Sequence, residues 1–68
     1  MTLIKLKQIR SDSGMTYQKV ADLVGVSKEY YWFIENGQRG LTYDMAVKIA
    51  SVFNKKPDEI FFEHKVNL

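Results

Sequence analysis

Apolar residues recur at intervals of three and four along most of the chain, and this spacing is typical of amphipathic helices rather than strands. They gather into short groups, each suited to one helix. The groups are Leu3, Leu6 and Ile9; Val20, Ala21, Leu23 and Val24; Tyr31 and Ile34; Ala46, Val47, Ile49, Ala50 and Phe53; and Ile60 with Phe61 or Phe62. Helices this short are marginal in isolation, so the sequence predicts an all-α domain of five helices that share one core.

Residues typical of helix ends separate these groups. Hydroxyl side chains suited to capping a helix N-terminus stand at Thr16, Ser27 and Thr42. Glycines suited to a helix C-terminus follow at Gly14, Gly25 and Gly37. The third helix is therefore expected from Lys28 to about Asn36. The fifth is expected to begin at Pro57, since proline suits the first helical position.

Composition narrows the possible functions. The 68 residues have room for one small domain, residues 1–68. With no cysteine and a single histidine, His64, the chain lacks the ligands of a typical zinc site, and neither a metal nor a cofactor is expected. The absence of cysteine, of a long apolar run and of a signal-peptide pattern predicts a cytoplasmic protein. Ten Lys and Arg against eight Asp and Glu leave a net charge of +2, which permits nucleic-acid binding without requiring it.

No pattern typical of an active site stands out. The serines have no histidine and acid at a recognisable spacing. The stretch Gly37-Gln38-Arg39-Gly40 lacks the pattern of a phosphate-binding loop and follows a predicted helix rather than a strand. An enzyme is therefore not expected.

The most informative stretch is residues 16–37, where two short helices are joined by Val24-Gly25-Val26-Ser27. The glycine permits a sharp reversal of the chain, Ala21 lets the two helices cross closely, and Val26 fills the corner between them. This is the sequence form of a helix-turn-helix.

The chain resembles the XRE-type helix-turn-helix family, which includes phage repressors and Cro. The resemblance covers about residues 5–62, and the matching residues are Ile9-Arg10, Thr16, Val20-Ala21, Gly25-Val26-Ser27, Ile34-Glu35-Asn36-Gly37, Ala50 and Pro57-Asp58-Glu59-Ile60-Phe61. It implies a DNA-binding transcriptional regulator, most like a small repressor of phage, plasmid or mobile-element type, that docks as a homodimer on a palindromic operator. It also implies that the helix from Lys28 enters the major groove while the helix after Thr16 crosses the phosphates.

A helical wheel divides the third helix into two sides. Tyr31, Ile34 and Glu35 point one way, with Tyr30 at the edge, and the opposite side carries Lys28, Glu29, Trp32, Phe33 and Asn36. On that side Lys28 suits guanine or a phosphate, Glu29 suits the amino group of cytosine, and the two aromatic rings suit thymine methyl groups. Contact with a partner protein and packing at the edge of the core are the alternatives for Trp32 and Phe33.

Further DNA contacts are expected on either side of this helix. The helix start at Thr16, Tyr17 and Gln18 offers backbone N–H groups that favour a phosphate. Ser27, which suits the cap of the third helix, is also expected to contact DNA. Tyr17 stands where many family members carry glutamine, and Thr16 is expected to cap its helix first. The family resemblance implies that the segment with Gln38, Arg39, Thr42 and Tyr43 follows the sugar–phosphate backbone. Arg39 is the strongest candidate there, because a guanidinium matches phosphate oxygens.

Arg10 and Glu35 are expected to form a structural ion pair. Glu35 lies on the inward side of its helix, where an unpaired carboxylate would be costly. Members of the family pair an arginine of the first helix with the glutamate that precedes Asn-Gly.

One other function stays open at this stage, a protein-interaction module on the same scaffold. In that case Trp32 and Phe33 would face a partner such as an antirepressor or a toxin. The fifth helix and the tail residues Phe62, Val66 and Leu68 are apolar enough for a small self-complementary contact between two copies. The alternatives are that these residues close the end of the core and that the chain is a monomer that pairs only on DNA.

Overall fold

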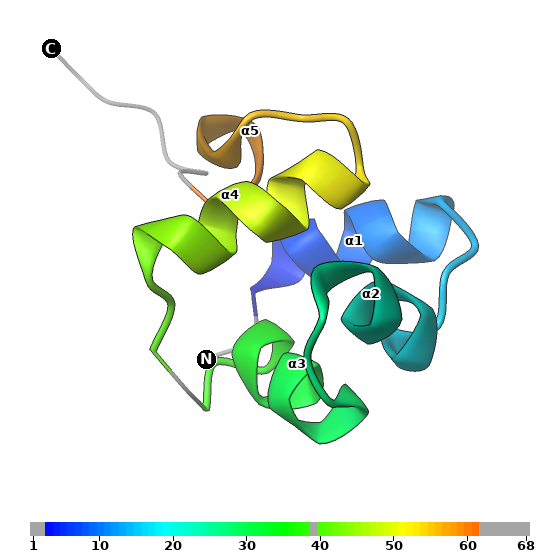
Figure 1. Cartoon of the computed structure of the whole chain (residues 1–68). Coiled ribbons are helices and arrows are strands. Elements are labelled where there is room, and N and C mark those ends of the chain that lie inside the picture. Colours follow the sequence, from blue (N-terminus) through cyan, green and yellow to red (C-terminus); the bar gives the residue numbers. More distant parts are fainter. Residues whose placement is uncertain (1–2, 39, 62–68) are drawn as a thin grey trace, which may run out of the picture.

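The computed structural model describes residues 3–38 and 40–61, and over these ranges it contains five α-helices and no strand (Figure 1). The helices are α1 (Ile4–Asp12), α2 (Tyr17–Val24), α3 (Lys28–Glu35), α4 (Tyr43–Val52) and α5 (Pro57–Phe61). The predicted all-α architecture of five short helices is confirmed.

The ends of the helices are stabilised by the residues that the sequence singles out. Three hydroxyl oxygens each accept a hydrogen bond from the backbone N–H three residues later: Thr16 from Lys19 (3.0 Å), Ser27 from Tyr30 (3.0 Å) and Thr42 from Met45 (3.2 Å). Gly25 ends α2 with φ of 93°, a left-handed conformation that glycine adopts without a steric penalty. These local signals therefore set where the chain reverses direction between helices.

The core lies where the helices meet. Helix α2 packs against α3 and α4, α1 packs against α3 and α5, and α4 packs against α5. The buried cluster consists of Leu6, Val20, Ala21, Tyr31, Ile34, Ile49, Ala50 and Ile60. In Figure 1, α3 lies at one end of this bundle and α5 near the other. One side of α3 is thereby used for packing while the helix stays at the edge of the molecule.

Two apolar residues expected on the core sides of their helices lie at the surface instead. Leu23 is 53% exposed and Val47 is 36% exposed. Val24 and Phe53 are only partly buried. The physical reason is that a short helix meets its neighbours along a narrow stripe, whereas the apolar residues of α2 and α4 spread more widely around the helix axis.

Several residues named from the sequence fall outside the described ranges. They are Arg39 and the tail residues Phe62, His64, Val66 and Leu68. Within the described ranges, no helix combines the length and the hydrophobicity needed to cross a membrane.

Candidate nucleic-acid interface

Helix α3 has one buried side and one exposed side. Tyr31, Ile34 and Glu35 are at most 1% exposed, whereas Trp32 and Phe33 are each 39% exposed. The predicted helical wheel is therefore correct for this helix. We call the other side of α3 with its C-cap residue the outward side, and its residues are Lys28, Glu29, Trp32, Phe33 and Asn36.

The chemistry of the outward side changes along its length. Lys28 and Glu29 are exposed in the first turn of α3. Asn36 is half-buried at the C-terminal end, where its Nδ2 donates a hydrogen bond to the carbonyl oxygen of Trp32 at 2.9 Å. Charged groups thus stand at one end, an amide at the other, and aromatic rings between them.

The two aromatic rings of the outward side contact each other. The ring centroids of Trp32 and Phe33 lie 5.4 Å apart, and the ring planes meet at 79°. This edge-to-face arrangement is one that aromatic pairs favour. The pair therefore forms one continuous apolar patch in the middle of the outward side.

Glu35 holds α3 in place from the buried side. Its carboxylate accepts hydrogen bonds from Arg10 Nε at 2.8 Å and Arg10 Nη2 at 3.0 Å, and a third from the Tyr31 hydroxyl at 2.8 Å. The predicted ion pair is thus present, as a two-pronged arrangement in which both carboxylate oxygens are used. Because Arg10 belongs to α1, this pair orients α3 relative to the rest of the domain.

Arg10 makes further contacts that the sequence analysis missed. Its Nη1 donates to the carbonyl oxygen of Met15 at 2.8 Å, and its guanidinium lies 4.1 Å from the centroid of the Tyr17 ring. The Tyr17 and Tyr31 rings are also close, with centroids 6.2 Å apart. No sequence signal identifies these contacts, because they depend on how α1, α2 and α3 pack together.

The surroundings of Glu35 shift the pKa values of both of its partners. Burial, followed by the hydrogen bond to Glu35, raises the pKa of the Tyr31 phenol well above its ordinary value. The hydrogen bond with Glu35 raises the pKa of the Arg10 guanidinium, against the opposing effect of burial. Both groups therefore stay protonated, and so remain hydrogen-bond donors, at neutral pH.

The start of α2 combines capping residues with exposed polar groups. Thr16 is exposed and caps the helix, and the exposed Gln18 donates from Nε2 to Asp22 Oδ1 at 2.8 Å. Tyr17 is half-buried, with its ring against Arg10. The first N–H groups of any α-helix lack acceptors within the helix, which makes such an end favourable for an anion. DNA contact by these three residues stays a prediction.

The segment that follows α3 is also accessible. Gln38 and Thr42 are exposed, and Tyr43 is 73% exposed at the start of α4. Arg39 lies outside the described residues. DNA contact along this segment likewise stays a prediction.

Similarity to known proteins identifies the family. The model of the helix-turn-helix family matches residues 6–60, which is most of the chain. This chain belongs to the helix-turn-helix family. That family consists of DNA-binding transcriptional regulators rather than enzymes, in line with the absence of an active-site pattern from the sequence.

The relatives of this family member span most of its length. A transcriptional regulator of helix-turn-helix type from Archaeoglobus fulgidus is 39% identical over 57 residues, which cover 84% of this chain and 80% of the relative. The regulator YgzD from Bacillus subtilis, also of helix-turn-helix type, is 29% identical over 63 residues, which cover 93% and 96%.

Two solved structures share the fold. The restriction-modification controller protein C.AhdI from Aeromonas hydrophila superimposes with a TM-score of 0.79 at 28% identity, over 84% of this chain and 86% of that chain. The clp gene regulator ClgR from Corynebacterium glutamicum has a TM-score of 0.80 at 20% identity, over 87% of this chain and 63% of that chain. The second likeness concerns the fold alone.

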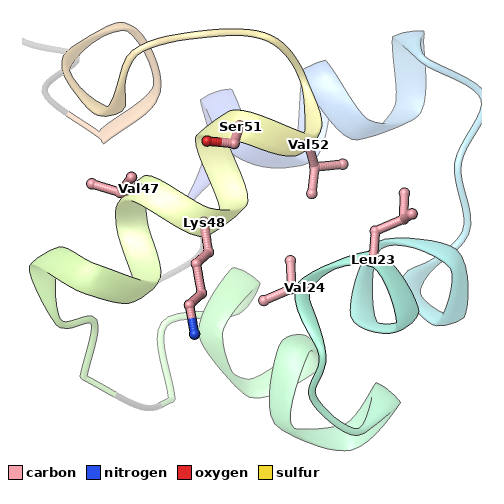
Figure 2. Close-up of a pocket in the computed structure, with 6 residues that line it drawn as sticks. All are labelled: Leu23, Val24, Val47, Lys48, Ser51 and Val52. Atoms are coloured by element: carbon pink, nitrogen blue, oxygen red, sulfur yellow. The ribbon is translucent and has the colours of Figure 1, made fainter.

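A groove away from α3 is mostly apolar. A groove of about 550 Å³ lies between α2 and α4, where Lys48 is the only charged residue in its lining (Figure 2). The other lining residues are Leu23, Val24, Val47, Ser51 and Val52. Over residues 3–38 and 40–61, no three His, Cys, Asp or Glu side chains gather where they could hold a metal ion.

Proposed function

We propose that this protein is a sequence-specific transcriptional regulator of the repressor type that binds a palindromic operator as a homodimer, with α3 in the major groove. One observation carries the proposal. The Arg10–Glu35 pair fixes the inward side of α3, and Lys28, Trp32 and Phe33 are left exposed on a helix at the edge of the molecule. A rigidly held helix with one accessible side is what reading of base edges requires.

The outward side of α3 supplies the base contacts in this proposal. Lys28 donates to guanine O6 and N7 or to a phosphate, and Glu29 accepts from the amino group of cytosine. The rings of Trp32 and Phe33 approach the bases between these groups and Asn36. The other proposed DNA contacts are Thr16, Tyr17, Gln18, Ser27, Gln38, Thr42 and Tyr43, together with Arg39, which is named from the sequence alone.

Contacts to phosphates position the helix in the groove. The caps Thr16, Ser27 and Thr42 use their oxygens as acceptors, and their hydroxyl protons remain suited to donation to phosphate oxygens. Three helix N-termini with these caps therefore offer polar contacts along the DNA backbone. A net charge of only +2 means that such placed contacts, rather than a general positive field, provide most of the attraction.

A palindromic target follows from two-fold symmetry. In a homodimer, each copy presents the same α3 to one half-site, and the half-sites lie about one turn of the duplex apart. The similarity to C.AhdI, a restriction-modification controller protein, supports a regulatory role for this protein.

Selection from a pool of random duplexes, carried out with the full chain at two salt concentrations, tests the proposal. We expect enrichment of one inverted repeat with half-site centres about 10 base pairs apart, and weaker binding at the higher salt. The variant Lys28→Ala, in the first turn of α3, should bind the enriched repeat more weakly, whereas Lys55→Ala, in the α4–α5 connection, should not. Failure to enrich any sequence would overturn DNA reading as the function.

Binding of a partner protein is a second candidate function, and the exposed aromatic pair is the one observation that favours it. Trp32 and Phe33 would then bind a partner protein, and the helix-turn-helix would serve as a scaffold. In that case the pool selection yields no enriched sequence, and replacement of Trp32 by serine abolishes binding of the partner without lowering the melting temperature.

A further inference from the structure

Trp32 and Phe33 place an apolar surface where base edges are expected. The edges of bases in the major groove are mostly hydrogen-bonding groups, namely N7, O6 and O4 acceptors and the amino groups of adenine and cytosine. A phenylalanine ring has no hydrogen-bonding atom, and an indole has one donor and no acceptor. Amino groups pressed against this pair would lose their water without gaining a partner. The pair therefore disfavours edges that present an amino group with no apolar group beside it, as adenine and unmethylated cytosine do.

The methyl group at C5 of thymine is the apolar group that the major groove offers. We infer that the Trp32–Phe33 pair is a reader of pyrimidine C5-methyl groups and makes thymine, or 5-methylcytosine, the preferred base opposite the centre of α3. The inference rests on the proposed function, because it requires α3 to lie in the major groove.

The spacing of the two rings defines how many bases they span. Their centroids are 5.4 Å apart, and successive base pairs are about 3.4 Å apart along the duplex. The pair therefore reaches over one to two base-pair steps, enough for methyl groups on neighbouring or next-neighbouring pairs. Each half-site is expected to contain one or two thymines whose methyl groups matter.

The packing of the rings on each other favours this role. The two rings already lie edge to face, so together they offer one apolar surface to a methyl group without rearranging. Both residues are also 39% exposed, so a methyl group has accessible surface to bury. We expect one such methyl to change the dissociation constant by about three- to fivefold, the value of one buried methyl group.

Replacement of thymine by deoxyuridine in the selected operator isolates the methyl group, since uracil keeps every hydrogen-bonding group of thymine. Each thymine of a half-site is replaced in turn, and the dissociation constant is measured with the full chain. We expect about three- to fivefold weaker binding at one or two positions and no change at the others. At those positions, a 5-methylcytosine·guanine pair should bind more tightly than an unmethylated cytosine·guanine pair by a similar factor.

Variants of the protein assign the effect to the rings. In Phe33→Gln or Trp32→Gln, the thymine-to-uracil ratio at the affected position should fall to about one. Lys28→Ala should weaken binding but keep the ratio. Both glutamine substitutions are at exposed positions, and a thermal melt of each free variant checks that it is folded.

The outcomes separate this inference from the proposed function. If an operator with every thymine replaced by deoxyuridine binds as tightly and as selectively as the original, methyl reading is overturned and the regulator proposal stays intact. An enriched operator without thymine in its half-sites would do the same. If no sequence is enriched, both proposals fail.

Discussion

Glu35 is the residue on which the orientation of α3 depends. Its side chain is fully buried, and three hydrogen bonds from Arg10 and Tyr31 satisfy its carboxylate. A buried charge of this kind is costly unless it is paired, so the arrangement favours one geometry more than it adds net stability. Loss of one partner should therefore be far more damaging than loss of the whole pair.

The substitution Arg10→Met tests this asymmetry. It leaves the Glu35 carboxylate buried without its cation and should lower the free energy of unfolding by about 3–5 kcal/mol. A domain of this size has only about 3–10 kcal/mol in total, so the melting temperature should fall by about 12 °C or more. The double variant Arg10→Met/Glu35→Met should recover a large part of the loss. A melting temperature within about 3 °C of the parent for Arg10→Met would contradict the role of the pair.

Because of Tyr31, the stability of the fold should vary with pH in the alkaline range. In the unfolded chain its phenol loses a proton near pH 10, whereas burial and the bond to Glu35 raise its pKa in the folded protein. Above pH 10 the unfolded state therefore binds fewer protons than the folded state, and the free energy of unfolding decreases as the pH rises. The contribution of this one group is at most about 1.4 kcal/mol per pH unit, and below pH 10 its effect is constant.

Urea unfolding between pH 8 and pH 11.5 measures this dependence. The variant Tyr31→Phe removes the titrating group and should be less stable at pH 8 by about 1 kcal/mol, because it lacks the hydrogen bond to Glu35. Its stability should then decline less steeply above pH 10, so that the two curves converge. Parallel curves for parent and variant would show that Tyr31 is not the group responsible.

At the scale of the helices, local sequence signals are sufficient to predict the features that depend on neighbouring residues alone. The capping hydroxyls, the glycines and the two sides of α3 follow from spacing alone. Leu23 and Val47 were placed wrongly because exposure depends on how far the neighbouring helix extends. The contacts of Arg10 with Tyr17 and Met15 were missed for the related reason that they join separate elements. Sequence therefore predicted the elements and the outward side of α3, and packing determined the rest.

The turn between α2 and α3 offers a test at this scale. Gly25 has φ of 93° and open space where a Cβ would stand, so Gly25→Ala should be destabilised by backbone strain alone, by about 1–2 kcal/mol. Gly40 provides a matched control, since its surroundings are equally open and its φ is not in the left-handed region. Gly40→Ala should be neutral or slightly stabilising. Equal effects of the two substitutions in thermal melts would argue against a strained turn at Gly25.

Over the whole molecule, ten cationic and eight acidic side chains nearly cancel, so the placement of each cation matters more than the net charge of +2. Lys28 lies on the outward side of α3, whereas Lys55 lies in the connection between α4 and α5, which runs across the opposite end of the bundle in Figure 1. The two residues carry the same charge, so a protein attracted to DNA by net charge alone would lose equal affinity when either is removed. A protein that docks through α3 would respond to one of them only.

Salt dependence of operator binding measures this difference. The logarithm of the association constant should fall linearly with the logarithm of salt concentration, with a slope of about −0.9 for each phosphate contacted. If Lys28 binds a phosphate, Lys28→Ala makes the slope shallower by about 0.9. If Lys28 binds guanine instead, Lys28→Ala keeps the slope and weakens the preference for guanine at that base pair. Lys55→Ala should change neither the slope nor the preference. Equal loss of affinity in the two variants would mean that DNA does not approach the molecule along α3.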